Sequence, residues 1–201
     1  MDFDLPSQIE QCAPGMDARL VSALVRRESN FNPFAIGMDG KDTLLQQPRD
    51  MAQAVATAEK LILEGRTFSV GLAQIHVSNI LAFGVTWRQS FDACTSLHYA
   101  QIVFQDFHAK AVKAGFKGDD ATFAALRGYN SGNIFAIVSN AYAARIMASA
   151  ATPGAPQAPQ TRQVQAVQLG MNERERTAGM PEPKAGVQEP KEVESLELFD
   201  Q

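Results

Sequence analysis

The sequence predicts a mainly α-helical domain of about 150 residues that contains one small β-hairpin and precedes a disordered tail. Apolar residues recur at three- and four-residue spacing along several long segments, which is typical of amphipathic helices. The turn dipeptide Asp39-Gly40 separates two short apolar runs, as in a hairpin. Six of the ten prolines lie after Ala151, together with a single aromatic residue, Phe199. The packed domain is therefore expected to end near Ala151.

The first long helix is predicted over residues 17–29. Asp17 is a suitable N-cap, because its side chain can accept hydrogen bonds from the first free N–H groups of the helix. The Asn32-Pro33 pair prevents its continuation, since a residue before proline avoids the helical conformation. One face of this helix carries a stripe at helical spacing: Val21, Leu24, Val25 and Glu28.

The hairpin is predicted in the segment that follows this helix. Phe34–Ile36 and Thr43–Leu45 are short apolar runs on either side of the turn at Asp39-Gly40. A Gly-containing loop is predicted farther along, over residues 68–75. The β-structure of the domain is therefore expected to be local and small.

The remaining predicted elements are helices. Pro48 is suited to the first position of a helix and Gly65 to its end, so a helix is predicted over residues 48–65. Asp120 is a suitable N-cap for a later helix. The other helices are predicted, in chain order, over residues 78–83, 95–114, 121–128 and 134–149.

The C-terminal segment differs in composition from the rest. Residues 152–201 contain five Lys and Arg, eight Asp and Glu and one aromatic side chain. Such a segment cannot bury enough apolar surface to offset the entropy lost on ordering. The prediction is a domain over residues 1–151 and a Pro-rich, acidic, disordered tail over residues 152–201, with a weak helical tendency at 192–199.

Composition also excludes several classes of function. The net charge is -4 and no dense Lys/Arg cluster is present, which argues against a nucleic-acid partner. No apolar run is long enough for a membrane span, and the first residues lack the basic start and apolar stretch of a secretory signal. No Cys-x-x-Cys pair occurs, and the three histidines have no metal-ligand spacing, so neither a metal nor another cofactor is predicted.

Glu28 is the most unusual residue of the predicted helices. It continues an apolar stripe and lies near a helix C-terminus, and both burial and the helix dipole raise the pKa of a carboxyl group. A carboxyl that stays protonated near neutral pH can act as a general acid. The structural alternative is that Glu28 pairs with Arg26, Arg27 or solvent at a frayed helix end.

Three short motifs carry a family resemblance. Glu28-Ser29 is followed by Gly-Leu-Ala-Gln-Ile at 71–75 and by Gly-Tyr-Asn-Ser-Gly at 128–132. This ordered set resembles the soluble lytic transglycosylases, which share the goose-type lysozyme-like fold. The segments Cys12-Ala13-Pro14 and Phe91-Asp92-Ala93-Cys94 are similar to the branch that serves type IV secretion and conjugation machines. The resemblance covers residues 9–146.

Two positions depart from that branch. His76 stands where the branch usually has Asn after the Gly-Leu-Ala-Gln-Ile segment. Asn140-Ala141-Tyr142 stands where it usually has Asn-Gly-Tyr. Neither departure affects Glu28.

The resemblance implies a catalytic mechanism. Glu28 would be the sole acid/base in a non-hydrolytic cleavage between N-acetylmuramic acid and N-acetylglucosamine of peptidoglycan, which leaves a 1,6-anhydro end. Tyr129 would orient Glu28 or stabilise positive charge, and Ser29 would contact the acetamido group or fix the loop. Gly71 would let the backbone approach the glycan. Gln74 and Asn130 would hydrogen-bond the sugar.

The resemblance also implies a setting. The chain would act in the periplasm, with type IV secretion components as partners. It would also form a disulfide between Cys12 and Cys94. From the residues alone, two free thiols are as plausible as this disulfide. Two other functions remain open. A hydrolytic muramidase would need a second carboxylate, for which Asp39 and Asp42 are the nearby acids. A non-catalytic wall-binding assembly factor would not need the acid.

Overall fold

The structure is a computed structural model that describes residues 5–40 and 42–152. Within those ranges the chain forms eight α-helices, one 3₁₀ helix and three short strands, so the predicted fold class is confirmed. The helices are α1 Leu5–Cys12, α2 Ala18–Ser29, α3 Met51–Leu63, α4 Val77–Phe83, α5 Trp87–Ser90, α6 Ala93–Lys113, α7 Gly118–Ser131, η1 Ile137–Ser139 and α8 Asn140–Ala151. The strands are β1 Ile36–Met38, β2 Phe68–Val70 and β3 Ile75–His76.

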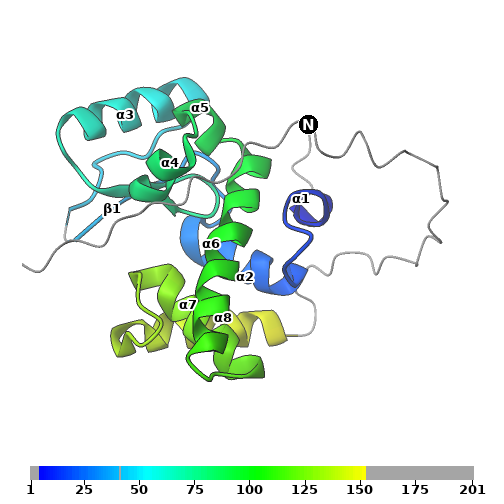
Figure 1. The fold of residues 1–201 in the computed structure, drawn as a ribbon. Coiled ribbons are helices and arrows are strands. Elements are labelled where there is room, and N and C mark those ends of the chain that lie inside the picture. The colour runs from blue at the N-terminus through cyan, green and yellow to red at the C-terminus, as the bar shows by residue number, and fades with distance from the viewer. Residues whose placement is uncertain (1–4, 41, 153–201) are drawn as a thin grey trace, which may run out of the picture. The chain divides into compact units, whose positions relative to one another are not determined.

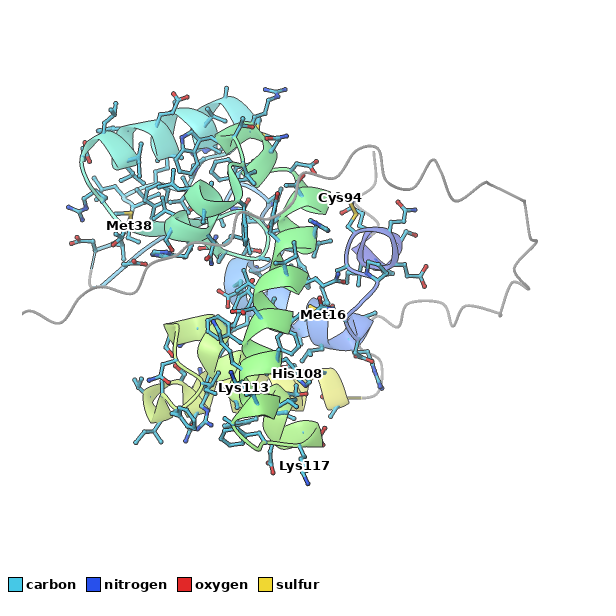
Figure 2. The ribbon with its side chains drawn as sticks, viewed as in Figure 1. Met16, Met38, Cys94, His108, Lys113 and Lys117 are labelled. Carbon is cyan, nitrogen blue, oxygen red and sulfur yellow. A yellow bond between two sulfur atoms is a disulfide. The ribbon has the colours of Figure 1, made fainter. Side chains whose placement is uncertain are left out.

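The long helix α6 is the element around which the others are arranged. The sheet lies toward one end of α6 together with α3, α4 and α5, and the helices α7 and α8 lie toward the other end (Figure 1). Figure 2 labels Cys94 and Lys113 near the two ends of this helix. Helix α2 packs on α8 and on α1, and in Figure 1 it lies between the two groups of elements. No helix in the described ranges is both long and apolar enough to cross a membrane.

The three strands form one antiparallel sheet in the order β1-β2-β3. Ile36 pairs with Val70, so the predicted hairpin between residues 34–36 and 43–45 is wrong. Pairing with β2 buries Phe68 and Val70 completely, whereas Leu45 is fully exposed. The chain does turn at Gly40, where φ is +78°. Strand β1 nevertheless pairs with β2, which lies in the segment predicted as a loop.

Several helix boundaries differ from the predictions. Helix α3 begins at Met51 with Asp50 as its N-cap, because that carboxylate accepts the Gln53 N–H at 2.9 Å. Helix α7 begins at Gly118 and contains Asp120 in its first turn, where a negative side chain interacts favourably with the helix dipole. The last predicted helix begins only at Asn140, after η1.

Two helices were not predicted from the sequence. Helix α1 has only eight residues, and α5 is a single turn stabilised by a capping box between Thr86 and Gln89. The tail predicted over residues 152–201 lies outside the described residues, except for Thr152. The domain boundary therefore stays a prediction, as does the helical tendency at 192–199.

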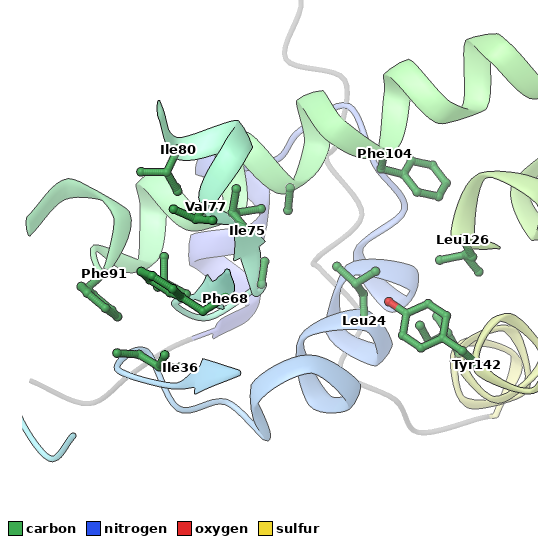
Figure 3. Close-up of a cluster of buried hydrophobic side chains, with 14 of the residues drawn as sticks. Leu24, Ile36, Phe68, Ile75, Val77, Ile80, Phe91, Phe104, Leu126 and Tyr142 are labelled. Carbon is green, nitrogen blue, oxygen red and sulfur yellow. The ribbon is translucent and has the colours of Figure 1, made fainter. Parts of the chain in front are cut away.

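Apolar side chains from the sheet and the helices meet in one main core. On the sheet side, Ile36, Phe68 and Phe91 are packed together, and on the helical side Leu24 faces Tyr142 (Figure 3). Full burial of such a Leu or Phe side chain stabilises the fold by roughly 1.5–3 kcal/mol. The face of α2 predicted from its apolar stripe is thus buried in the core, and Glu28 lies one turn beyond Leu24.

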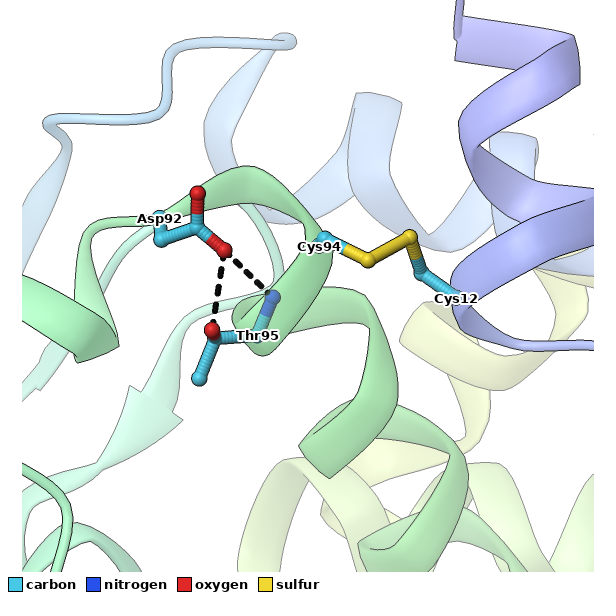
Figure 4. The surroundings of a disulfide bond; sticks show 4 residues. All are labelled: Cys12, Asp92, Cys94 and Thr95. Carbon is cyan, nitrogen blue, oxygen red and sulfur yellow. Dashed lines mark hydrogen bonds between the residues drawn. A yellow bond between two sulfur atoms is a disulfide. The ribbon is translucent and has the colours of Figure 1, made fainter.

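A disulfide links the N-terminal segment to α6. Cys12 at the end of α1 is bonded to Cys94 in the first turn of α6, with their Cα atoms 5.1 Å apart (Figure 4). Asp92 caps the same turn, because its carboxylate accepts the Thr95 N–H at 2.8 Å. The pairing implied by the resemblance is therefore present. It fixes α1 beside a small core formed by Ile9, Val21, Val25, Leu72 and Leu97.

We expect the disulfide to contribute to stability by restricting the unfolded chain. Replacing both Cys12 and Cys94 with Ala should lower the free energy of unfolding by about 2–4 kcal/mol, the upper value being that of a long closed loop. Urea denaturation with and without a thiol reductant measures this difference. The parent should lose stability on reduction and the double variant should not. Equal midpoints for all four samples would contradict the prediction.

Candidate active site

Glu28 lies in the last turn of α2, at the point where the helix leaves the core. Asp17 caps the other end of α2 by accepting the Arg19 and Leu20 N–H groups at 3.0 Å. Asn30 ends the helix in the left-handed conformation, with φ of +49°. The capped ends and the buried stripe fix α2, and they place the Glu28 carboxyl partly buried against the core.

Tyr142 of α8 donates a hydrogen bond to Glu28 Oε1. Tyr142 is buried, and its ring packs in the main core. Burial and the nearby Glu28 charge raise the pKa of the Tyr142 hydroxyl, so it remains a protonated donor at any physiological pH. The hydroxyl therefore holds the carboxyl group in a defined position at the junction of α2 and α8.

The surroundings of Glu28 raise its pKa from 4.5 to about 7. Burial is the main cause, because the ionised form loses its hydration. The hydrogen bond from Tyr142 and the positive charge of Arg27 act in the opposite direction and lower the pKa. The carboxyl group is consequently balanced between its acid and base forms near neutral pH. A pKa above the ordinary value is also what the position of Glu28 on the apolar stripe predicts.

The segment 71–75 is fixed by hydroxyl groups from three helices. Ser29 Oγ of α2 donates to the Leu72 carbonyl at 2.7 Å, and Tyr129 Oη of α7 donates to the Ala73 carbonyl at 2.8 Å. Ser96 Oγ of α6 accepts the Ala73 N–H at 3.0 Å. Ser29 thus fixes the loop, which is one of its two expected roles. The loop is rigidly connected to the helix that carries the acid.

The predicted orientation of Glu28 by Tyr129 is not what the structure shows. The direct hydrogen bond to Glu28 comes from Tyr142, and the Tyr129 hydroxyl is used for the Ala73 carbonyl. Tyr129 remains close enough for the Glu28 charge to raise its pKa, after the larger effect of burial. The sequence carries one signal for Tyr142, which is the aromatic residue on the buried side of α8.

Gln74 lies within this loop in a conformation unusual for a residue other than glycine, with φ of +51°. Its Nε2 donates to the Ala35 and Gly71 carbonyls, both at 3.0 Å. These two bonds stabilise a backbone conformation that costs about 1 kcal/mol or more. They also leave Oε1 as an acceptor, and Gly37 provides its space, because a Cβ there would lie 2.5 Å from that oxygen.

Gly71 has a different role from the one expected. It is buried rather than open to a ligand, and its φ of +80° is accessible mainly to glycine. A Cβ at this position would lie 2.6 Å from the Ser90 carbonyl oxygen. Gly71 is therefore required for close packing of the loop on the protein itself, and it does not line the cleft.

A cleft of about 450 Å³ separates the sheet side from the helical side of the site. Gln74, His76 and Asn79 contribute to one wall, and Phe107, Tyr129 and Asn130 to the other. Asn130 Nδ2 donates to Ser139 Oγ at 2.9 Å, which leaves its Oδ1 as an acceptor. Glu28 is not a lining residue, whereas Tyr129, whose pKa its charge helps to raise, borders the cleft. Three of the predicted site residues thus share the cleft: Gln74, Tyr129 and Asn130.

The described residues contain no group of three His, Cys, Asp or Glu side chains suited to hold a metal ion. The chemistry available at the site is instead that of one partly buried carboxyl group, together with the Gln74 and Asn130 amides that line the cleft. A helical domain with a small antiparallel sheet, a cleft and a partly buried Glu at the end of a core helix defines a lysozyme-like domain.

The family follows from comparison with known proteins. The model of the transglycosylase SLT domain matches residues 6–145, and the chain belongs to this family. A type IV secretion system protein virB1 of Brucella abortus is 37% identical over 125 residues, which cover 62% of this chain and 52% of that protein. A protein virB1 of Rhizobium radiobacter is 27% identical over 143 residues, covering 70% and 58%. The chain spans about half the length of these relatives, and no solved structure matches it.

The raised pKa of Glu28 predicts a dependence of stability on pH. Because the folded-state pKa lies above the unfolded value, this group favours the folded state below pH 4.5, and that contribution is lost as the pH rises toward 7. Glu28→Gln removes the ionisation, so the variant should be more stable than the parent at pH 8, by at most about 3 kcal/mol. Urea denaturation at pH 4 and pH 8 tests this, and a pH-independent difference would contradict it.

Removal of the Tyr142 hydroxyl should change the pKa of Glu28 in a defined direction. Because that hydrogen bond lowers the pKa, Tyr142→Phe should raise it above about 7. Carbon NMR of the labelled Glu carboxyl groups measures the titration directly. Tyr99→Phe is the matched control, since Tyr99 stacks on Phe83 and has no contact with Glu28. An unchanged or lower pKa in Tyr142→Phe would refute this assignment.

Proposed function

We propose that the chain is a peptidoglycan lytic transglycosylase in which Glu28 is the only catalytic acid and base. The observation that carries the proposal is the partly buried Glu28 carboxyl, whose pKa is about 7 and whose position is set by Tyr142. Membership of the transglycosylase SLT family supports the reaction class. The substrate would be the β-1,4 bond between N-acetylmuramic acid and N-acetylglucosamine.

The first step uses the acid form of Glu28. The carboxyl group donates its proton to the bridging oxygen, and the bond from that oxygen to C1 of the muramic acid residue breaks. The acetamido oxygen of the same sugar attacks C1 and takes up the developing positive charge. The leaving glucosamine retains the proton as its new hydroxyl group. Glu28 is left as a carboxylate.

The second step uses the base form of the same residue. The Glu28 carboxylate removes the proton from the C6 hydroxyl of the muramic acid, and O6 forms a bond to C1 as the acetamido oxygen departs. This closes the 1,6-anhydro ring and returns Glu28 to its acid form. No water is consumed, so a second carboxylate is unnecessary, in contrast to most glycosidases. A pKa near 7 suits a group that serves in both forms.

The neighbouring residues would bind and position the sugar. The free acceptor oxygens of Gln74 and Asn130 are available for hydroxyl or acetamido N–H groups in the cleft. Tyr129 would stabilise positive charge at C1, because it lines the cleft and is close enough to Glu28 to interact with its charge. Ser29 would act indirectly, by holding the Leu72 carbonyl and thus the loop that carries Gln74.

We further propose that the enzyme acts in the periplasm, as part of a type IV secretion or conjugation system. The support is similarity to proteins named for such a system and the disulfide between Cys12 and Cys94, a bond that persists in oxidising compartments. Local opening of the wall would let the secretion machine assemble through it. Components of that machine would be its protein partners.

One observation favours a second candidate, hydrolysis by a muramidase. Asp39 lines the cleft and is a carboxylate that could activate water, whereas Asp42 is paired with Arg66. A third reading, a wall-binding factor without activity, gives no reason for a carboxyl group with a pKa near 7. Loss of secretion in a Glu28→Gln strain would favour catalysis over scaffolding.

The catalytic assignment predicts the effect of Glu28→Gln on wall cleavage. The amide is almost isosteric but cannot donate an acidic proton, so the rate should fall by about 10²–10⁴-fold. Release of soluble fragments from purified cell wall measures the rate, with thermal unfolding as the check of the fold. Glu59→Gln, an exposed position on α3, is the matched control. A rate within about threefold of the parent in folded Glu28→Gln would rule out this role.

A further inference from the structure

The sheet wall of the cleft carries a pair of side chains that the proposed reaction does not use. His76 Nε2 lies 3.0 Å from Asp39 Oδ2, and both residues line the cleft. Asp39 directly follows β1, and His76 ends β3 and caps α4. The pair was not singled out from the sequence, because two residues that are far apart in the chain meet only through the pairing of β1 and β3 with β2.

The hydrogen bonds of His76 assign the position of its proton. His76 Nδ1 accepts from the Ser78 backbone N–H at 3.2 Å, and a backbone N–H can only donate. Nδ1 therefore carries no proton, and the proton is on Nε2, where it is donated to Asp39. In this arrangement the imidazole is neutral. It orients the carboxylate of Asp39 but does not neutralise its charge.

The neighbouring acid, Asp42, is in the opposite situation. It forms an ion pair with Arg66, whose guanidinium group neutralises it. Asp39 has no cationic partner among the described residues, and it is the only residue lining the cleft that carries a formal charge while His76 is neutral. Its side chain is 45% exposed, so the charge is open to a ligand at the edge of the cleft.

We propose that Asp39, oriented by His76, binds a primary ammonium group of the polymer that occupies the cleft. The identity of that polymer as peptidoglycan rests on the proposed function. Two groups of peptidoglycan carry this charge: the free amine of a diamino acid in the peptide, and the amine of a glucosamine residue that has lost its acetyl group. Asp39 is thus a specificity-determining residue that favours strands with free amines.

The test compares Asp39→Asn with the parent on soluble, uncrosslinked wall strands. The amide keeps the shape of Asp39 but removes its charge, so KM should rise about two- to fivefold, the range for a solvent-exposed charge pair, with kcat unchanged. The rise should shrink at high salt. Asp42→Asn is the matched control, because it removes an acid of the same segment that does not line the cleft. An unchanged KM in Asp39→Asn overturns the proposal.

Two modified substrates identify the source of the ammonium group. Strands with all amines acetylated should abolish the difference between Asp39→Asn and the parent. Strands stripped of peptides by an amidase abolish it if the amine is on the peptide, and retain it if the amine is on glucosamine. A difference that persists on fully acetylated strands would mean that Asp39 binds a neutral donor such as a hydroxyl group, and the proposal would be wrong.

A binding measurement separates this inference from the proposed function. The same three kinds of strand are titrated calorimetrically into Glu28→Gln and into Glu28→Gln/Asp39→Asn. The second protein should bind the amine-bearing strands about two- to fivefold more weakly and the acetylated strands equally well. This result can be obtained even if the parent does not cleave the wall. Equal affinities for the amine-bearing strands would overturn the role of Asp39 and would leave the proposed function unaffected.

The role of His76 is tested by non-additivity. His76→Phe removes the donor that orients Asp39, and should produce a KM increase similar to that of Asp39→Asn. The double variant should show no further increase, because both changes remove the same interaction. Additive increases would show that His76 does not act through Asp39. Thermal unfolding of each variant checks that loss of the α4 cap has not unfolded the sheet side.

Discussion

The hydrogen bond from Tyr142 to Glu28 is the contact on which the candidate site depends. It joins α2 to α8, two elements from opposite ends of the described chain, inside the apolar surroundings of Leu24. Burial raises the pKa of the carboxyl group, because the ionised form loses its hydration. The Tyr142 hydroxyl and the charge of Arg27 partly offset that effect, and the resulting pKa is about 7. A group balanced in this way can serve as acid and as base.

The same helix also positions the loop that forms part of one wall of the cleft. Ser29, the residue after Glu28, holds the Leu72 carbonyl, and Tyr129 and Ser96 hold Ala73 from two other helices. The loop is therefore fixed relative to the carboxyl group by bonds to α2, α6 and α7. The disulfide to the first turn of α6 and the small core that contains Leu72 further stabilise this arrangement. Small displacements of any of these helices would change the distance between the Glu28 carboxyl group and the loop.

The sequence predicted what is determined by local pattern and by motif. The helix that carries Glu28 followed from its cap and its apolar stripe, and the motif residues meet around one loop and cleft. Contacts between distant segments could not be read in this way. The strand pairing depends on burial of Phe68 rather than on the nearby turn, and the position of Tyr142 beside Glu28 depends on how α8 packs. Gly71 was expected to face the glycan, yet its positive φ and its close packing against the Ser90 carbonyl explain the glycine.

The central claim is that one carboxyl group performs both proton transfers and that water takes no part. Cleavage of purified peptidoglycan in water enriched in heavy oxygen tests this claim most directly, with the products analysed by mass spectrometry. The account predicts fragments that end in 1,6-anhydromuramic acid, lighter than reducing-end fragments by one water molecule and free of the label. Reducing ends that carry heavy oxygen at C1 would contradict the account and would establish hydrolysis instead.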